Sequence, residues 1–386
     1  MQINTELNIL FSPKKIGNVQ IKNRIVRSAT FERRAEKYGH ISDQLIEFYG
    51  ELARGGTGLI ITGFTAVDPS GTASPYQACL YDDSFIPGHK KLVSSVHEYS
   101  DVKIALQIAH TGRQGDHPKY HPVAPSAIPY KNTGLTPREL SNEEIGVFIN
   151  KFVDAGRRAY ECGYDMVQLH AAHGYFLCNF ISPRTNKRLD EFGGTIEKRT
   201  KILKDIYQGI RDELGKNFPI TIKLQTQDFI PGGLTLEEGV RIAKFLSDIG
   251  FDAIEPSGGG AETQIGVKNA YPSKVIKSPE DENYFLPTAK KIKPFMKNCA
   301  LVLMGGIKNP ISAEKILQNE SADFISMCRP LIYEPNLPNR WKDGDHSPAK
   351  CISCNSCYMT MLTGPIYCVV RKKVERKRKK KRENFV

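Results

Sequence analysis

Eight short apolar runs recur along the chain, separated by longer stretches with helical spacing and charge. Each run is rich in β-branched and apolar residues, as is typical of strands that are buried on both faces of a parallel sheet. Alternation of strands and helices predicts such a sheet, and eight units predict a closed α/β architecture, the (β/α)8 TIM barrel, rather than an open doubly wound sheet. The runs span residues 25–30, 58–63, 104–108, 166–170, 220–224, 253–256, 301–305 and 324–327.

Two further segments mark the limits of the predicted barrel. Residues 11–22, with Gly17-Asn18 at their centre, predict an N-terminal hairpin that caps the bottom of the barrel. Three prolines after Leu331 indicate that the barrel ends there. We therefore expect a barrel over residues 1–345, a small cysteine-rich extension over 346–370 and a basic tail over 371–386.

The net charge of +12 is mainly a property of that tail. Residues 371–386 hold ten Lys or Arg and two Glu, which leaves a charge of only +4 for the other 370 residues. A run of like charges is typical of a solvated, disordered terminus, and the alternative is binding to nucleic acid or another acidic surface. The chain has neither a run of about 18 apolar residues nor a secretory signal layout, so we expect a cytoplasmic protein without a membrane partner.

Candidate site residues lie at or just after the C-terminal ends of the predicted strands. Catalytic groups of a (β/α)8 barrel sit at the C-terminal ends of its strands, so we expect these side chains to converge on one site. They are Thr30, Gln107, His110, His170, His173, Lys223, Gln225, Ser257, Gly305, Gly306 and Arg329.

His170 and His173 follow the fourth strand and are three residues apart. A helical pair with this spacing could bind zinc, but no nearby Asp, Glu or Cys completes a set of three or four ligands. Two buried core histidines would each need hydrogen-bond partners, which is costly at one strand end. We therefore favour a pair that faces a ligand.

Lys223 lies within an apolar strand, where its ammonium group needs a negative partner. Either Lys223 forms a Schiff base, or its cation faces an electron-rich cofactor ring. Gly305-Gly306 and Arg329 follow the seventh and eighth strands, where barrels of this class commonly bind phosphate.

Six phrases in fixed order resemble the Old Yellow Enzyme family of FMN-dependent ene reductases. The similarity spans residues 8–345 and implies FMN as cofactor and NAD(P)H as reductant. The phrases begin at Lys22 (KNRIV), Gln107 (QIAHTGR), Ala124 (APS), His170 (HAAHGY), Ser182 (SPRTN) and Asp190 (DEFGG).

The resemblance implies a role for each residue that matches. Ser28, Ala29 and Thr30 would line the flavin near N5 and O4, and Gln107 would bind its pyrimidine edge. Lys223 would stand beside N1 and O2, where the family often has an arginine. Cys328 replaces a glycine that often precedes the phosphate arginine. The implied cofactor-binding set is Ser28, Ala29, Thr30, Gly63, Gln107, Lys223, Gly305, Gly306, Cys328 and Arg329.

The implied reaction is the reduction of an electron-poor alkene, such as an enone or enoyl compound. His170 and His173 would hold the carbonyl oxygen, where negative charge develops in the transition state. Tyr175 would protonate the α-carbon while flavin N5 delivers hydride to the β-carbon. Two other hypotheses stand beside this one: a Schiff-base aldolase or lyase that uses Lys223, and a non-enzymatic scaffold whose tail binds nucleic acid. The sequence leaves the oligomeric state open, a homo-oligomer included.

Cys351, Cys354, Cys357 and Cys368 fall within eighteen residues. In a cytosolic chain, such a cluster indicates metal before disulfides. It resembles the segment that holds a [4Fe–4S] cluster in the 2,4-dienoyl-CoA reductase and trimethylamine dehydrogenase group, although the last gap is shorter here. An iron–sulfur cluster, structural zinc and metal-free cysteines therefore stay open as interpretations.

Overall fold

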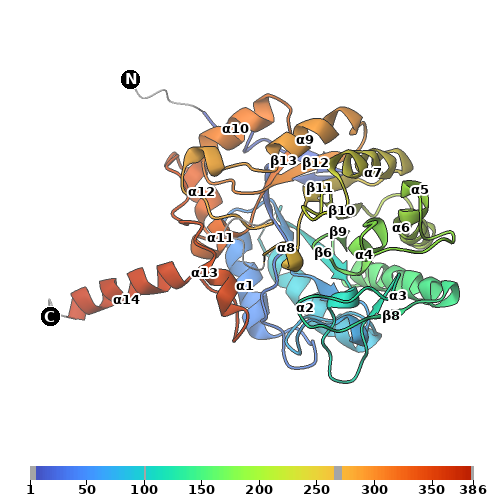
Figure 1. Cartoon of the computed structure of the whole chain (residues 1–386). Helices are drawn as coiled ribbons and strands as arrows, with labels where there is room; N and C mark the ends of the chain where they lie inside the picture. The colour runs from blue at the N-terminus through green and yellow to red at the C-terminus, as the bar shows by residue number, and fades with distance from the viewer. Residues whose placement is uncertain (1–5, 100, 265–271, 384–386) are drawn as a thin grey trace.

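Eight parallel strands close into a barrel in the computed structural model, which describes residues 6–99, 101–264 and 272–383 (Figure 1). Each strand pairs with the next along the chain, and the last pairs with the first, so the barrel has no free edge. The predicted (β/α)8 barrel is thus confirmed. Its strands are β3 (Ile25–Arg27), β4 (Leu59–Ile61), β6 (Lys103–Ala109), β9 (Met166–Ala171), β10 (Ile220–Gln225), β11 (Ala253–Ser257), β12 (Ala300–Met304) and β13 (Phe324–Met327).

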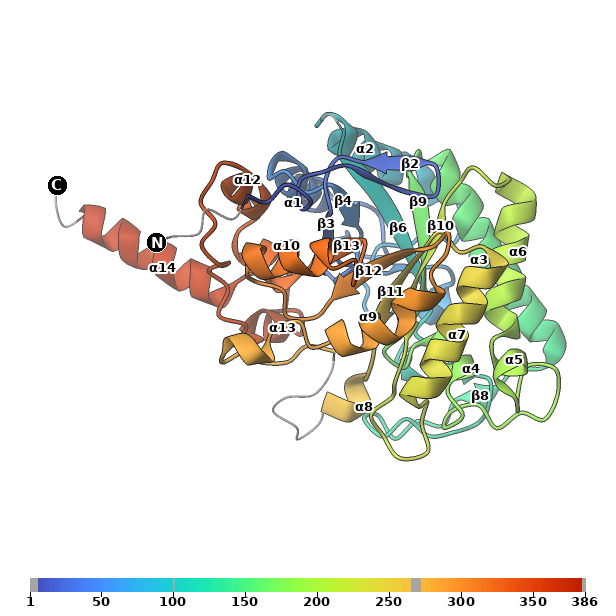
Figure 2. The same cartoon turned by 90° about the horizontal axis from the view of Figure 1, so that it is seen from above.

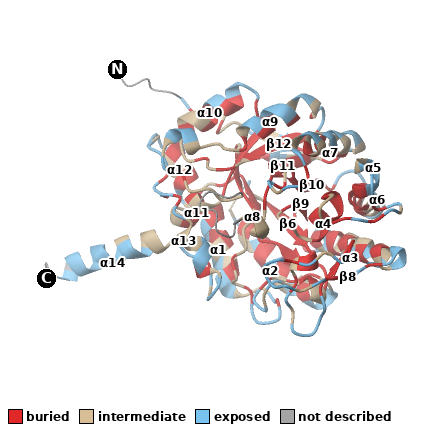
Figure 3. Cartoon of the chain, viewed as in Figure 1, coloured by how far each residue is buried: buried red, intermediate tan, exposed pale blue. Residues whose placement is uncertain are grey.

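Helices surround the strands, and their buried faces cover the outside of the barrel (Figures 2 and 3). Local signals set their ends: Ser141 and Glu144 form a capping box at the start of α3, and left-handed Gly250, with φ 107°, ends α7. The helices are α1 (Asp43–Arg54), α2 (Ile86–His97), α3 (Asn142–Glu161), α4 (Phe176–Ile181), α5 (Ile196–Arg199), α6 (Lys201–Leu214), α7 (Leu236–Ile249), α8 (Ala261–Gln264), α9 (Leu286–Ile292), α10 (Pro310–Gln318), α11 (Arg329–Tyr333) and α12 (Leu337–Lys342).

Short elements occupy the connecting loops. They are the strands β5 (Thr65–Ala66), β7 (Val123–Ala124) and β8 (Arg138–Glu139), and the 3₁₀ turns Pro69–Gly71, Asp83–Phe85, Gly112–Gln114, Pro279–Asp281 and Lys293–Phe295.

The inside of the barrel has an apolar lower layer and a polar upper layer. Side chains alternate along each strand, so every second residue points inward. Near the N-terminal ends the inward residues form one apolar cluster: Val26, Leu59, Ile61, Ala105, Met166, Ala253, Ala300, Val302 and Phe324. Further along the strands, buried polar side chains succeed them: Ser28, Gln107, Gln168, His170, Lys223, Glu255, Ser257 and Ser326.

The predicted hairpin closes the bottom of the barrel. Strands β1 (Lys14–Ile16) and β2 (Val19–Ile21) pair in antiparallel register across Gly17-Asn18. Ile16 and Ile21 are buried in the same apolar cluster as the lower layer. Gly17 adopts φ 55°, and a Cβ there would lie 2.7 Å from the Asp252 carboxylate. The tight turn at the barrel base therefore requires glycine.

The extension carries α13 (Ser356–Thr360) and α14 (Val369–Glu383), and α14 projects away from the barrel (Figure 1). The basic tail is thus helical where it is described, in contrast to the disorder that its charge predicted. Lys and Arg have high helix propensity, and Glu375 accepts a hydrogen bond from Arg371 one turn earlier at 2.7 Å. No helix in the described ranges has the length and apolar character to cross a membrane.

Candidate active site

A cavity of about 550 Å³ lies above the polar layer, at the C-terminal ends of the strands. The predicted site residues Ser28, Ala29, Thr30, Gln107, His170, His173, Tyr175, Lys223 and Cys328 line it. The remaining predicted cofactor-binding residues, Gly63, Gly305, Gly306 and Arg329, lie outside this lining.

A buried ion pair forms part of the cavity floor. Lys223 on β10 is in register with His170 on β9 and with Glu255 on β11, so the three side chains share one inward layer. Lys223 Nζ lies 2.9 Å from Glu255 Oε2 and donates to Ser28 Oγ at 2.8 Å. Because Lys223 and Glu255 are only 2% and 1% exposed, each charge depends on the other for compensation. Glu255 is therefore the negative partner that Lys223 required.

Glu255 also accepts hydrogen bonds from β9, from β13 and from the residue that follows β3. Ser28 Oγ and Ser326 Oγ donate to its Oε1 at 2.7 and 2.9 Å, and Gln168 Nε2 donates to its Oε2 at 3.2 Å. Burial alone would raise the pKa of Glu255, but the Lys223 ammonium and these hydroxyl donors hold the pKa below its usual value. Gln107 Nε2 extends the network by donating to Gln168 Oε1 at 2.7 Å, so its own amide oxygen is the atom with capacity for a ligand N–H.

The two histidines differ in how the protein holds them. His173 has φ 62°. Its backbone N–H donates to Gln225 Oε1 at 2.9 Å, and its Nε2 lies 2.8 Å from Ser257 Oγ. His170 packs edge-on against His173 at 5.1 Å between ring centres. His170 Nδ1 is buried and has no hydrogen-bond partner among the described residues. An unpaired buried imidazole nitrogen at a cavity indicates a missing ligand atom.

Both imidazoles are neutral at physiological pH. Burial lowers the pKa of His173 to about 3, with a further contribution from the Lys223 cation. Burial, His173 and Lys223 together lower the pKa of His170 well below its usual value. Each ring therefore offers one N–H donor without carrying a net charge.

Tyr175 stands beside this pair. Its ring centre lies 5.0 Å from that of His170 and 5.2 Å from that of Phe64. Burial, followed by the phenol groups of Tyr358 and Tyr130, raises the pKa of Tyr175. The hydroxyl keeps its proton at neutral pH and is available as a donor.

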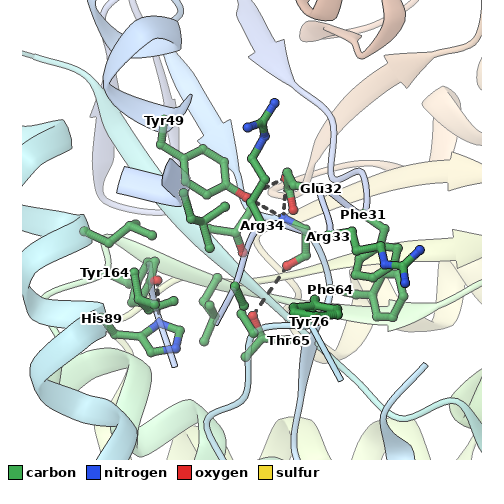
Figure 4. A pocket seen from close by; sticks show the side chains of 18 residues that line it. Phe31, Glu32, Arg33, Arg34, Tyr49, Phe64, Thr65, Tyr76, His89 and Tyr164 are labelled. Atoms are coloured by element: carbon green, nitrogen blue, oxygen red, sulfur yellow. Dashed lines mark hydrogen bonds between the residues drawn. The ribbon is translucent and has the colours of Figure 1, made fainter. Parts of the chain in front are cut away.

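Gly63 has a structural role rather than a place in the cavity. Gly63 lines a second, smaller pocket, and Figure 4 shows Glu32 and Tyr49 in that pocket. The Gly63 N–H donates to Glu32 Oε1 at 3.1 Å and to the Tyr49 hydroxyl at 2.8 Å. A Cβ at Gly63 would collide with Glu32 and with the Thr30 carbonyl. Gly63 therefore supports the loop that carries Thr30.

The predicted phosphate residues lie outside the cavity lining, but their chain neighbours Met304 and Cys328 belong to it. Gly305 and Gly306 adopt φ 111° and 81°, and a Cβ on either would touch the Tyr284 ring within 3.0 Å. Arg329 Nη1 donates to Asn355 Oδ1 at 2.6 Å and to the Lys274 carbonyl at 2.7 Å. Packing thus places Arg329 beside the cysteine-rich extension.

All four clustered cysteines line one small pocket together with Arg329. Backbone N–H groups of Ser353 and Arg371 lie 3.4 and 3.5 Å from the sulfurs of Cys351 and Cys368. Within the described ranges no three side chains already form a metal-binding group. The donor set fits a four-thiolate centre in its chemistry and its shared pocket, although the thiols are not preassembled around a metal.

His110, which follows β6, lies outside the cavity lining and belongs to a Ser–His–Asp cluster. The Gly112 N–H donates to His110 Nδ1 at 2.9 Å, so His110 Nε2 carries the hydrogen and donates to Ser70 Oγ at 3.0 Å. The Ser70 hydroxyl in turn donates to Asp68. A nucleophilic serine needs the opposite direction of proton donation, so this cluster is no hydrolase triad.

The cavity fits the ring system of a flavin. It has a hydrogen-bonded polar floor, an amide oxygen and a buried cation to meet a polar ring edge, and aromatic walls from Phe31 and Phe64. His170 Nδ1, which has no partner among the described residues, can donate to or accept from a second ligand in the same cavity.

A family model, described as the NADH:flavin oxidoreductase / NADH oxidase family, matches residues 9–347. The chain belongs to this family. The predicted family is thus confirmed, and membership supports FMN as cofactor and NAD(P)H as reductant.

Curated relatives resemble this chain in sequence, and solved structures resemble it in fold. An NADH oxidase from Thermoanaerobacter brockii is 39% identical over 90% of this chain, and the chain spans about half (52%) of that relative. A 2-naphthoyl-CoA reductase structure with bound 2-naphthoyl-CoA matches with TM-score 0.86 and 30% identity, covering 94% of this chain and 57% of that one. An old yellow enzyme homologue from Zymomonas mobilis matches with TM-score 0.72 and 28% identity, covering 86% and 92%.

Sequence reasoning missed two parts of the site. Glu255 was visible as a charged residue inside an apolar strand, which is the same signal that singled out Lys223. Tyr358, Met361 and Leu362 of the extension also line the cavity, and no local pattern distinguishes them from solvent-facing residues.

Proposed function

We propose that this chain is an FMN-dependent NAD(P)H oxidoreductase that reduces electron-poor alkenes such as enones or enoyl compounds. The observation that supports this most strongly is the group of neutral donors at one cavity: His170, His173 and the protonated Tyr175. Membership in the NADH:flavin oxidoreductase family supports the redox part of the proposal. The assignment of an electron-poor alkene as the substrate rests on these three donors.

Ser28, Ala29, Thr30, Gln107 and Lys223 would hold the FMN ring, and bound FMN would supply hydride chemistry after reduction by NAD(P)H. Gln107 offers its amide oxygen to a ring N–H, and Lys223 places a cation at the ring edge. Gly305, Gly306 and Arg329 remain the candidates for the phosphate end, because their chain neighbours Met304 and Cys328 line the cavity.

His170 and His173 would bind the carbonyl oxygen that is conjugated with the alkene. Addition at the β-carbon builds negative charge on that oxygen, and fixed N–H donors in a buried site stabilise this charge. Neutral imidazoles suit the task because their N–H groups donate without protonating the oxygen outright. The hydrogen bond from the His173 backbone N–H to Gln225 Oε1 fixes the position of one of the two donors before a substrate binds.

Tyr175 would supply the proton to the α-carbon. Its raised pKa means that the phenol gives up the proton only to a strong base, such as an enolate that forms in the cavity. Its position beside His170 places it next to the carbonyl site.

The interpretation of Lys223 as a Schiff-base nucleophile has no support in the geometry. Such a lysine needs an amine that is free to attack a carbonyl, whereas Lys223 Nζ lies 2.9 Å from the Glu255 carboxylate and donates to Ser28 Oγ. Family membership also argues against a non-enzymatic scaffold.

We infer that the four cysteines hold a [4Fe–4S] cluster. Four thiols line one pocket, backbone N–H groups approach two of the sulfurs, and Arg329 lines the same pocket as a nearby cation. Anaerobically purified protein should contain about four iron and four acid-labile sulfide per chain. Zinc without sulfide, or neither metal, would contradict this inference.

The alkene proposal is tested with the double variant His170→Ala, His173→Ala and its single-site control His121→Ala, an exposed histidine away from the cavity. The wild type, the double variant and the control should all retain FMN, and NAD(P)H should bleach the flavin of each under anaerobic conditions. Reoxidation by cyclohex-2-enone should slow by about 10²- to 10³-fold or more in the double variant alone. An unchanged rate in the double variant would refute the role of the pair.

A further inference from the structure

Part of the cavity wall comes from the cysteine-rich extension. Tyr358, Met361 and Leu362, hereafter the extension wall, line the cavity opposite the barrel strands. Tyr358 lies on α13 directly after Cys357. Tyr358 and Leu362 are 46% and 63% exposed, so both present apolar surface at the cavity.

One loop of the barrel, residues 32–34, holds the segment that carries the extension wall. Arg33 Nη1 donates to the Met361 carbonyl at 2.8 Å. The Ile366 N–H donates to the Glu32 carbonyl at 2.9 Å, and Arg34 Nη2 donates to the Ile366 carbonyl at 2.8 Å. The loop that carries these partners follows Thr30 at the cavity floor. The wall therefore has a defined position relative to the reacting groups.

The other side of the cavity is aromatic. Phe31 and Phe64 pack against each other with ring centres 5.1 Å apart, and Phe64 continues to Tyr175. The phenol of Tyr358 contributes to the raised pKa of Tyr175, in agreement with its place across the cavity from that group. A substrate held at the histidines thus has polar groups below it and apolar surfaces on two sides.

We propose that the extension wall selects acceptors with an aromatic or branched apolar substituent on the conjugated system. Binding such a substituent would remove the exposed faces of Tyr358 and Leu362 from water, and this gain is available only to substrates long enough to reach the wall. A small cyclic enone occupies the histidine site without touching it. The inference rests on the proposed function for the position of the carbonyl, and it adds the substrate class.

Binding to the oxidised holoenzyme tests the wall without turnover. We would titrate the protein with 4-phenylbut-3-en-2-one and with cyclohex-2-enone and follow the flavin absorption spectrum. The variants are Tyr358→Ala and Leu362→Ala. The matched control is Met359→Ala, since Met359 is 60% exposed in the same segment and lies outside the cavity lining. Tyr358→Phe keeps the apolar surface.

The wild type should bind the aryl enone more tightly than cyclohex-2-enone. Each alanine variant of the wall should weaken aryl enone binding by about 10-fold and cyclohex-2-enone binding by less than about 2-fold. Met359→Ala and Tyr358→Phe should match the wild type for both ligands. Equal weakening for the two enones, or none, overturns the inference, as does a wild type that shows no preference.

Turnover separates this inference from the proposed function. If the wall variants lose aryl enone binding but neither enone reoxidises the reduced wild-type protein, the proposed alkene reduction fails and the binding wall stands. If both enones are reduced with equal efficiency by the wild type and the wall variants, the wall fails and the proposed function stands.

Discussion

The substitution Glu255→Gln removes one charge from the floor of the cavity and little else. Gln can turn its amide oxygen toward Lys223 and Gln168, which now donate to Oε2. The hydroxyls of Ser28 and Ser326, which now donate to Oε1, can rotate and accept from the amide nitrogen. The shape and the number of hydrogen bonds are thus preserved, and the Lys223 cation loses its counterion.

The magnitude follows from the burial of the pair. Breaking a buried ion pair by neutralising one partner costs about 3 to 5 kcal/mol, and we expect this loss in the free energy of unfolding of the flavin-free protein. Two unit charges about 8 Å apart in an effective dielectric of about 20 interact by about 2 kcal/mol. Removing a negative charge near the flavin should therefore raise its two-electron reduction potential by about 40 mV.

Urea unfolding of the flavin-free protein and spectroelectrochemistry of the holoenzyme measure the two effects. Glu314→Gln is the control, because Glu314 is also fully buried but accepts hydrogen bonds from Ile9 and Leu10 and does not line the cavity. The control should lose stability and leave the potential unchanged. A potential that does not move, or falls, in Glu255→Gln would refute the assignment of the ion pair to the flavin site.

Two further predictions concern a proton donor and the pH dependence of stability. Tyr175→Phe should slow alkene reduction by about 10²- to 10⁴-fold and leave flavin reduction by NAD(P)H unchanged in stopped-flow measurements; equal slowing of both half-reactions would argue against a proton donor. Burial lowers the pKa of His89 and His110 to about 4 and that of His173 to about 3, so the unfolded chain takes up protons below about pH 6.5 while the folded protein does not. Their stability contribution is present above that pH and is lost as the pH falls toward these values, by on the order of 1.4 kcal/mol per pH unit for each histidine. His89→Gln should reduce the slope of unfolding free energy against pH by about that amount, and an unchanged slope would contradict the buried neutral state.

Local patterns were sufficient for the barrel. Each strand is a short apolar run, and each prediction of such a run depends only on neighbouring residues, as do the capping box at Ser141 and the turn at Gly17. The helix over the described part of the basic tail was not predicted, because charge content alone does not separate a solvated helix from a disordered segment.

The cavity residues were predictable because their positions repeat. A polar residue at an inward position near the end of a parallel strand faces the same cavity as its counterparts on the other strands, so Gln107, His170 and Lys223 could be grouped from the sequence. The phosphate residues were less predictable, since Arg329 hydrogen-bonds to Asn355 of the extension and to the Lys274 carbonyl, which are distant in sequence.

The sequence by itself determined the eight strands, their order and the polar groups at their ends, because these follow from side-chain alternation and chain order. The tertiary structure alone decided that Glu255 compensates Lys223, that His170 Nδ1 has no partner among the described residues, and that Tyr358 and Leu362 face the cavity. The ion pair joins residues 32 positions apart, and the hydrogen bond from Arg33 to Met361 that holds the extension joins residues 328 positions apart. Such choices are made by the packing of the whole barrel against its extension, and no local stretch of sequence contains them.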